Sequence, residues 1–211
     1  MVLTCKPDIL GRPMSTTASA SAMSRARFWG LALAVQGGVV LLALLVAWVL
    51  SIPLKSMVRW DSTSALWGLL AVLPMLLVYF FSPGLRKLAM ESLGNSLRQL
   101  RWWELVELAA LAGFGEELLF RGVLYAGLAR WHVGAAIVLS NLAFGMLHAL
   151  SLNYFLVTTG IGLAMHFLAE ATGARNLLAP MIAHGVYDLV AFVLLIRETR
   201  TDAVPDETSE K

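Results

Sequence analysis

The sequence predicts an all-α protein: a polytopic transmembrane helical bundle of about six spans with one amphipathic helix at the membrane interface. Of the 211 residues, 58% are hydrophobic and only 14% are charged, and the mean hydropathy is +0.73. These values lie far from the composition of a soluble domain. The apolar residues also gather in long runs, and most of the basic residues stand between those runs.

The apolar runs predict the spans one by one. A helix needs about 20 apolar residues to cross a bilayer, and residues 28–52 meet this with no charged residue. The second run, 65–81, contains Pro74, which a membrane helix tolerates because neighbouring groups can satisfy the freed carbonyl. The third run, 102–128, carries several ionisable residues. The remaining spans are expected at 134–150, 154–169 and 177–196.

Polar segments divide the rest of the chain. Leucines alternate with charged residues in the segment 83–101, which predicts a helix lying in the membrane interface. We expect a disordered tail at 1–24, an integral membrane domain at 25–198 and a polar C-terminal tail at 199–211. The single cysteine, Cys5, allows neither an intrachain disulfide nor a cysteine metal cluster.

The basic residues also predict the orientation. With six spans the two termini share a side, and that side holds 11 Lys and Arg residues against 4 on the other. The positive-inside rule therefore places both termini in the cytoplasm of a plasma (inner) membrane. A net charge of +2 gives no reason to expect nucleic acid as a partner, whereas membrane lipid is expected around the spans.

The third span contains the densest group of ionisable residues. Ionisable side chains inside a span are costly unless paired or hydrated, so they are functional candidates by default. Residues four apart share a helical face, so Glu117 can pair with Arg121 while Glu116 points elsewhere. We therefore predict that Glu117 and Arg121 are structural and that Glu116 is free to accept a proton from water.

Two further spans carry paired polar residues at the same spacing. Phe144 precedes His148 by four residues, and His184 precedes Asp188 by four, so each pair lies on one helical face. Together with Glu116 they come from three separate spans. Polar sites in helix bundles are assembled in this way from facing helices.

Three other ionisable residues are interpreted as outside the site. Glu104 and Glu107 follow two tryptophans, a residue common at membrane interfaces, so both glutamates are expected there, with a role in substrate entry as the alternative. His166 has no partner by spacing and is interpreted as a packing residue.

These motifs resemble those of the CPBP family, the CAAX-protease and bacteriocin-processing membrane peptidases also called the Abi family. The resemblance covers about residues 102–195 and rests on three elements in order. They are Glu-Glu-x-x-x-Arg at Glu116, Glu117 and Arg121, Phe-x-x-x-His at Phe144 and His148, and His-x-x-x-Asn/Asp at His184 and Asp188. Each element alone is weak, but three in order, each in its own apolar segment, are specific.

The resemblance implies an intramembrane endopeptidase whose catalytic core is 102–196. Its substrate would be a membrane-associated or lipidated protein, or a leader peptide. Glu116 would activate water alongside His148, while His184 and Asp188 would stabilise the oxyanion or hold a metal. Glu117, Arg121 and Phe144 would give structural support.

The family's mechanism is described both as glutamate-type and as metal-dependent, and both remain open here. In the metal version a divalent ion such as zinc would be held by Glu116, His148, His184 and Asp188. Many relatives have Asn where this chain has Asp188. An ionised carboxylate cannot donate a hydrogen bond to an oxyanion as an amide can. The aspartate at 188 therefore favours a role in metal ligation or in orienting His184.

Two other functions use the same residues. A non-catalytic membrane scaffold or immunity protein could share the fold, because fold does not fix activity. Under that alternative, Glu116→Ala would leave the protein's function unchanged. A small transporter could use the buried carboxylates and histidines as a proton or metal relay, but the sequence shows no internal repeat of the kind many transporters have.

Overall fold

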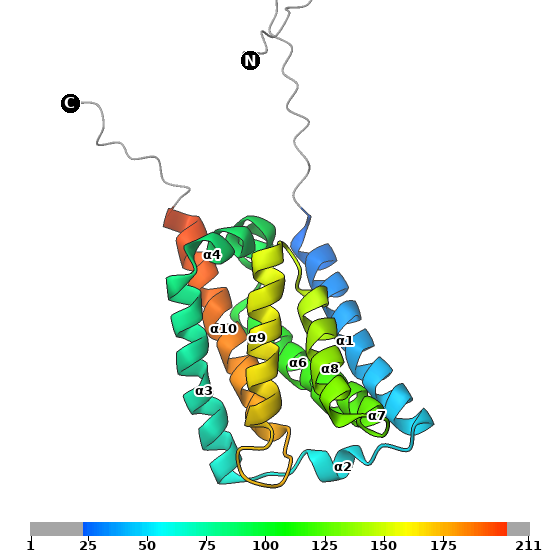
Figure 1. The fold of residues 1–211 in the computed structure, drawn as a ribbon. Helices are drawn as coiled ribbons and strands as arrows, with labels where there is room; N and C mark the ends of the chain where they lie inside the picture. Colours follow the sequence, from blue (N-terminus) through cyan, green and yellow to red (C-terminus); the bar gives the residue numbers. More distant parts are fainter. Residues whose placement is uncertain (1–22, 202–211) are drawn as a thin grey trace, which may run out of the picture.

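The structure, a computed structural model, describes residues 23–201, and every regular element within them is helical (Figure 1). The expected tails 1–24 and 199–211 lie mostly outside these residues. The elements in chain order are α1 (Arg25–Val49), α2 (Leu54–Met57), α3 (Ser62–Phe81), α4 (Pro83–Ala89), η1 (Met90–Gly94), α5 (Asn95–Leu97), α6 (Trp102–Glu117), η2 (Leu118–Leu124), α7 (Tyr125–Ala129), α8 (Val133–Leu147), α9 (Leu152–Leu168) and α10 (Leu178–Thr201).

Three of these helices are long and apolar enough to cross a membrane: α1, α3 and most of α10. Their outward faces carry large apolar side chains, such as Leu41, which is 68% exposed, and Trp48, which is 78% exposed. An apolar surface of this extent requires lipid rather than water around it. The chain is therefore a membrane protein.

The other predicted spans are helical but shorter. Helices α8 and α9 are apolar with 15 and 17 residues, and the predicted third span is divided into α6, η2 and α7. A 15-residue helix rises only about 22 Å, less than the hydrocarbon core of a bilayer. The count of six spans remains a prediction, since three helices meet the length needed to cross.

Helix α10 lies at the centre of the bundle, packed against α3 on one side and α6 on the other. Helix α1 packs against the far side of α6, and α8 packs against α9. Figure 1 shows α4 across one end of the bundle, where α1 begins and α10 ends, and α2 at the opposite end. The described ends of the chain thus share one end of the bundle, as an even number of crossings requires, while the cytoplasmic assignment of that end stays a prediction.

Side chains cap the first turns of α3 and α9. Asp61 precedes α3 and accepts hydrogen bonds from the backbone N–H groups of Thr63 and Ser64. Ser151 precedes α9 and accepts one from the N–H of Tyr154. A capping oxygen satisfies donors that the first helical turn leaves unpaired.

Glycines let α6 approach its neighbouring helices closely. A Cβ atom at Gly113 would lie 2.6 Å from the backbone nitrogen of Gly185 on α10. One at Gly115 would lie 2.8 Å from Cγ2 of Val40 on α1. A side chain at either position would collide, so α6 is held tightly between α10 and α1.

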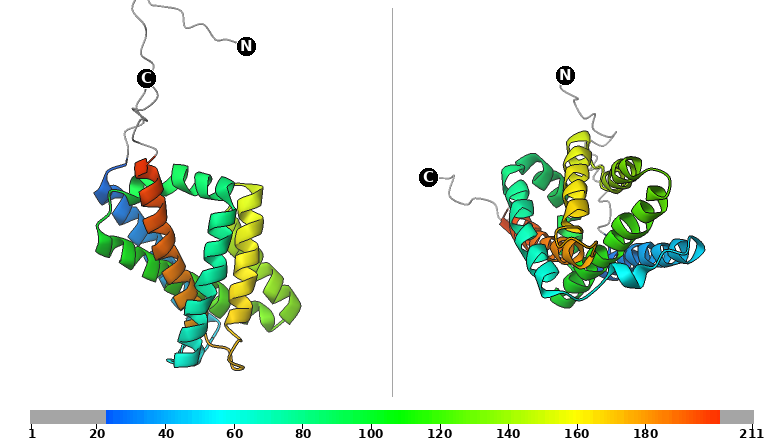
Figure 2. Two further views of the ribbon diagram at one scale, coloured as in Figure 1. Left: turned by 90° about the vertical axis from the view of Figure 1, so that its left-hand side faces the viewer. Right: turned by 60° about the horizontal axis from the view of Figure 1, so that its bottom comes forward.

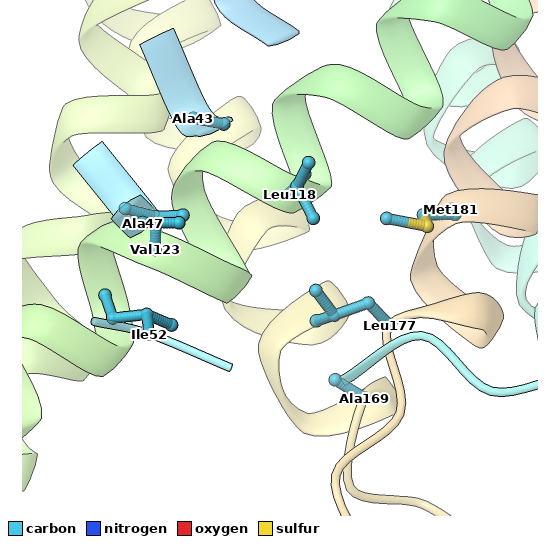
Figure 3. Packing of buried hydrophobic residues seen from close by; sticks show 8 residues of the cluster. All are labelled: Ala43, Ala47, Ile52, Leu118, Val123, Ala169, Leu177 and Met181. Carbon is cyan, nitrogen blue, oxygen red and sulfur yellow. The ribbon is translucent and has the colours of Figure 1, made fainter. Parts of the chain in front are cut away.

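A hydrophobic cluster fixes the end of α6. Figure 3 shows the side chains of this cluster, which come from α1, the segment after it, η2, the end of α9 and the start of α10. They are Ala43, Ala47, Ile52, Leu118, Val123, Ala169, Leu177 and Met181. Since Leu118 directly follows Glu117, this packing fixes the helix end that carries both glutamates.

The predicted interfacial segment is a series of short elements, α4, η1 and α5, which run across the bundle rather than along it (Figure 2). It is tied to α10 by an ion pair between Arg86 and Glu198, with N and O 3.2 Å apart. Placement at the membrane interface remains a prediction.

Glu104 is buried inside the protein in the first turn of α6. Its side chain is only 1% exposed and accepts two hydrogen bonds from the Arg25 guanidinium and one from the backbone N–H of Arg101. A buried carboxylate is tolerated when it is paired in this way. Glu104 therefore joins the start of α1 to the start of α6, whereas Glu107 is exposed.

Candidate active site

A cavity of about 420 Å³ lies inside the bundle, and Glu116, His148, His184 and Asp188 all line it. Most of its other lining side chains are apolar and come from α1, α3, α4, α9 and α10. Ligand sites in proteins commonly combine a largely apolar wall with a few convergent polar groups. The residues selected from the sequence are therefore brought together around one cavity.

Glu116 and His148 form the first pair of polar groups. Oε2 of Glu116 lies 3.5 Å from Nε2 of His148 and has no hydrogen-bond partner among residues 23–201. The other ring nitrogen, Nδ1, lies 2.9 Å from the carbonyl oxygen of Phe144. A carbonyl can only accept, so Nδ1 carries a proton, and Nε2 is the ring nitrogen that faces Glu116.

The short length of α8 explains how these two residues meet. Straight helices spanning the full bilayer would place His148 near the membrane surface and Glu116 near the middle. Instead α8 ends at Leu147, and His148 is its C-cap residue, directly before the turn into α9. Because the helix stops early, His148 lies at the depth of Glu116.

Glu117 is fully buried and links two partners. Its Oε1 accepts a hydrogen bond from Nη1 of Arg121 at 2.8 Å, the contact expected from their spacing. The same oxygen lies 2.9 Å from Nδ1 of His184. The carboxylate therefore also orients a histidine of the cavity, a contact that the sequence interpretation missed. A carboxylate held by Arg on one side is a fixed acceptor for an imidazole on the other.

His184 and Asp188 form the second pair along α10. Nε2 of His184 lies 3.5 Å from Oδ2 of Asp188, and the residues are four apart on one helix face. Each nitrogen of this ring therefore faces a carboxylate, Glu117 on one side and Asp188 on the other. Such a ring can carry protons on both nitrogens and act as a charged hydrogen-bond donor.

The Phe144 ring packs among the charged groups. The Arg121 guanidinium lies over it with 4.0 Å between the guanidinium carbon and the ring centroid. The His148 ring lies 4.6 Å away and the His184 ring meets it edge-on at 5.9 Å. Cations over aromatic faces are stabilised electrostatically, and ring contacts fix side-chain rotamers. The contacts support the structural role proposed for Phe144.

A π-helical turn, η2, begins directly after Glu117. Such turns are uncommon and occur often at functional sites, because they widen the helix and leave backbone groups unpaired. The carbonyl oxygen of Arg121 accepts a hydrogen bond from Nη2 of Arg175 at 2.8 Å. Arg175 also lies over the Tyr125 ring, 4.0 Å from its centroid. Arg175, in the loop between α9 and α10, thus holds the turn that follows the two glutamates.

Gln36 of α1 also reaches the site, and the sequence interpretation did not include it. Its Nε2 donates a hydrogen bond to Oε1 of Glu116 at 3.0 Å across 80 positions of the chain. A signal was present in the sequence, since Gln36 is the only amide side chain in the apolar run 28–52.

A metal-dependent mechanism would require the candidate ligands to surround one ion. Among residues 23–201, no group of three or more His, Cys, Asp or Glu side chains is placed so that it could hold an ion. His148 pairs with Glu116, while His184 is bonded through Nδ1 to Glu117 and faces Asp188 with Nε2. The candidate ligands thus form two pairs rather than one coordination sphere, and they do not fit a metal in this arrangement.

Comparison with known proteins addresses the same region. Residues 98–190 match the family model described as Type II CAAX prenyl endopeptidase Rce1-like, and this segment holds all three motifs. A curated relative, the uncharacterized protein YpbD of Bacillus subtilis (strain 168), is 36% identical over 89 residues. That match covers 41% of this chain and 42% of the relative's length. No solved structure matches the chain. On this evidence, residues 98–190 form a domain of the Rce1-like type II CAAX prenyl endopeptidase family.

Proposed function

We propose that the protein is an intramembrane endopeptidase that hydrolyses a peptide bond of a membrane-associated or lipidated protein or of a leader peptide. The observation that carries the proposal is the pairing of Glu116 with His148 at the wall of a cavity that is otherwise mostly apolar. The pair offers two acceptors to one water molecule, and the apolar wall suits a substrate delivered from the membrane.

Hydrolysis would begin at a water in the cavity that contacts both Oε2 of Glu116 and Nε2 of His148. Glu116 takes one proton as the water oxygen bonds to the peptide carbonyl carbon, and His148 holds the water by accepting from it. The tetrahedral intermediate then collapses, the C–N bond breaks, and the proton held by Glu116 passes to the leaving amine. General acid–base catalysis of this kind contributes about 10²- to 10⁴-fold in rate.

His184 is the group we assign to the developing oxyanion. It lines the same cavity, and Glu117 fixes its ring through Nδ1. A donor held in place before the reaction stabilises negative charge without reorganising. Asp188 faces the other nitrogen, Nε2, and its negative charge would favour a proton there for donation to the oxyanion.

Cleavage by the purified protein tests the proposal. The protein in lipid nanodiscs is incubated with a synthetic peptide ending in a farnesylated CAAX sequence, with the same peptide lacking the lipid, and with a hydrophobic leader peptide. Products are identified by mass spectrometry. We expect one new internal cleavage in at least one membrane-bound peptide. Failure to cut any of the three, with protein that remains folded, would contradict the proposal.

Asp188→Asn distinguishes the glutamate-type mechanism from the metal version. An amide at this position keeps the size of the side chain and adds a donor near the oxyanion, so we expect cleavage within about threefold of wild type or faster. In the metal version the same change removes a negative ligand, so bound metal and activity should fall together. Elemental analysis and initial cleavage rates of both forms, before and after chelation, separate the two.

A further inference from the structure

The amide of Gln36 lies against the glutamate to which the proposed function assigns the proton transfer. Its Nε2 is 3.0 Å from Oε1 of Glu116, and both side chains line the cavity. We propose that Gln36 is a positioning residue that holds the Glu116 carboxylate for catalysis. The proposal rests on the proposed function and adds to it a residue from outside the family-matched segment, 98–190.

The position of Gln36 follows from the packing of α1 on α6. At Gly115, next to Glu116, an added Cβ would lie 3.6 Å from the carbonyl oxygen of Gln36 and 2.8 Å from Cγ2 of Val40. The glycine thus lets the two helices approach at the level of the site. At this distance an amide on α1 can reach the carboxylate of Glu116 directly.

The cost of burying this amide argues for a specific use. A polar side chain in an apolar span is unfavourable unless it is hydrogen-bonded, and a leucine would serve packing against lipid better. Oε1 of Gln36 is buried without a hydrogen-bond partner, so only half of the amide is satisfied. Among residues 23–201, the hydrogen bond to Glu116 is the interaction of this side chain that offsets the cost.

The hydrogen bond also gives the two carboxylate oxygens of Glu116 different surroundings. Oε1 is held by Gln36, while Oε2 faces Nε2 of His148 at 3.5 Å with no hydrogen bond of its own. Rotation of the carboxylate would exchange these oxygens and move the acceptor away from the water. A fixed carboxylate keeps the reacting atoms aligned, and a misplacement of about 1 Å can lower a rate by about 10²-fold.

The test replaces Gln36 by methionine, which keeps the length of the side chain and removes the donor. We expect kcat to fall about tenfold, the equivalent of one hydrogen bond to a charged group, with KM changed less than about twofold. The thermal unfolding midpoint should stay within about 2 °C, since an apolar side chain in α1 is compatible with the membrane. The matched control is Gln99→Met, because Gln99 lies outside the cavity and, within the described part of the chain, its amide donates to backbone oxygens of Met23 and Asn95.

The readouts separate positioning from a structural role and from failure of the proposed function. A kcat for Gln36→Met within twofold of wild type, while Glu116→Gln is inactive, would overturn the positioning role alone. A lowered unfolding midpoint or a raised KM with unchanged kcat would also overturn it, because both indicate packing or substrate binding. Full activity in Glu116→Gln would instead overturn the proposed function.

Discussion

Glu116→Gln is expected to lower the cleavage rate about a thousandfold while leaving the amount of folded protein unchanged. The amide has nearly the same shape as the carboxylate but cannot take a proton from water, and general-base catalysis is worth about 10²- to 10⁴-fold. Among residues 23–201, the ion pair of Arg121 is with Glu117, through Nη1, and not with Glu116. Loss of the charge at 116 therefore leaves the buried pair intact.

The measurement is the initial rate of peptide cleavage by protein purified in parallel. Glu107→Gln is the matched control, because Glu107 lies on the same helix but is exposed. It should cleave at the wild-type rate. If Glu116→Gln cleaved at the wild-type rate, Glu116 would not be the general base. If Glu116→Ala also left the protein's function unchanged, the non-catalytic scaffold would be favoured.

Arg121→Ala has the largest expected effect on stability. Arg121 and Glu117 are both fully buried, so removing the arginine leaves a carboxylate without its cation, at a cost of roughly 3–5 kcal/mol. The variant also loses the guanidinium packed on Phe144. We therefore expect little folded protein in the membrane, in contrast to Glu116→Gln.

Folded protein is measured by monodisperse elution in mild detergent and by the thermal unfolding midpoint. Arg98→Ala serves as the control, because Arg98 is exposed and belongs to the segment across the end of the bundle. It should behave as wild type. If Arg121→Ala and Glu116→Gln were recovered in equal amounts with equal midpoints, the division between a structural and a chemical glutamate would be wrong.

Local spacing was enough to predict the contacts within single helices. The pairing of Glu117 with Arg121 and that of His184 with Asp188 both follow from four-residue spacing on an α-helix. Hydrophobic runs likewise located the helices to within a few residues, because the bilayer demands long apolar segments. These predictions need no knowledge of how the helices pack.

Contacts between distant helices were not predictable in the same way. The bond from Gln36 to Glu116 and the bond from Glu117 to His184 join positions 80 and 67 apart. They depend on the depth and rotation of each helix, which the glycine contacts and the π-helical turn after Glu117 set. The hydrophobic periodicity of the sequence gives neither the depth nor the rotation of a helix. Burial of Glu104 was missed for the same reason, because its partner Arg25 starts another helix.

The most direct test of the account is to follow the oxygen of water into the product. Wild type and Glu116→Gln, both treated with chelator and checked for bound metal by elemental analysis, are incubated in H₂¹⁸O with the peptide that wild type cleaves. We predict one ¹⁸O atom in the new carboxyl group of the wild-type product, at the same rate before and after chelation, and about a thousandfold slower formation of product by Glu116→Gln. Equal labelled product from Glu116→Gln, or loss of wild-type cleavage when a stoichiometric bound metal is removed, would contradict a water activated by Glu116 and His148.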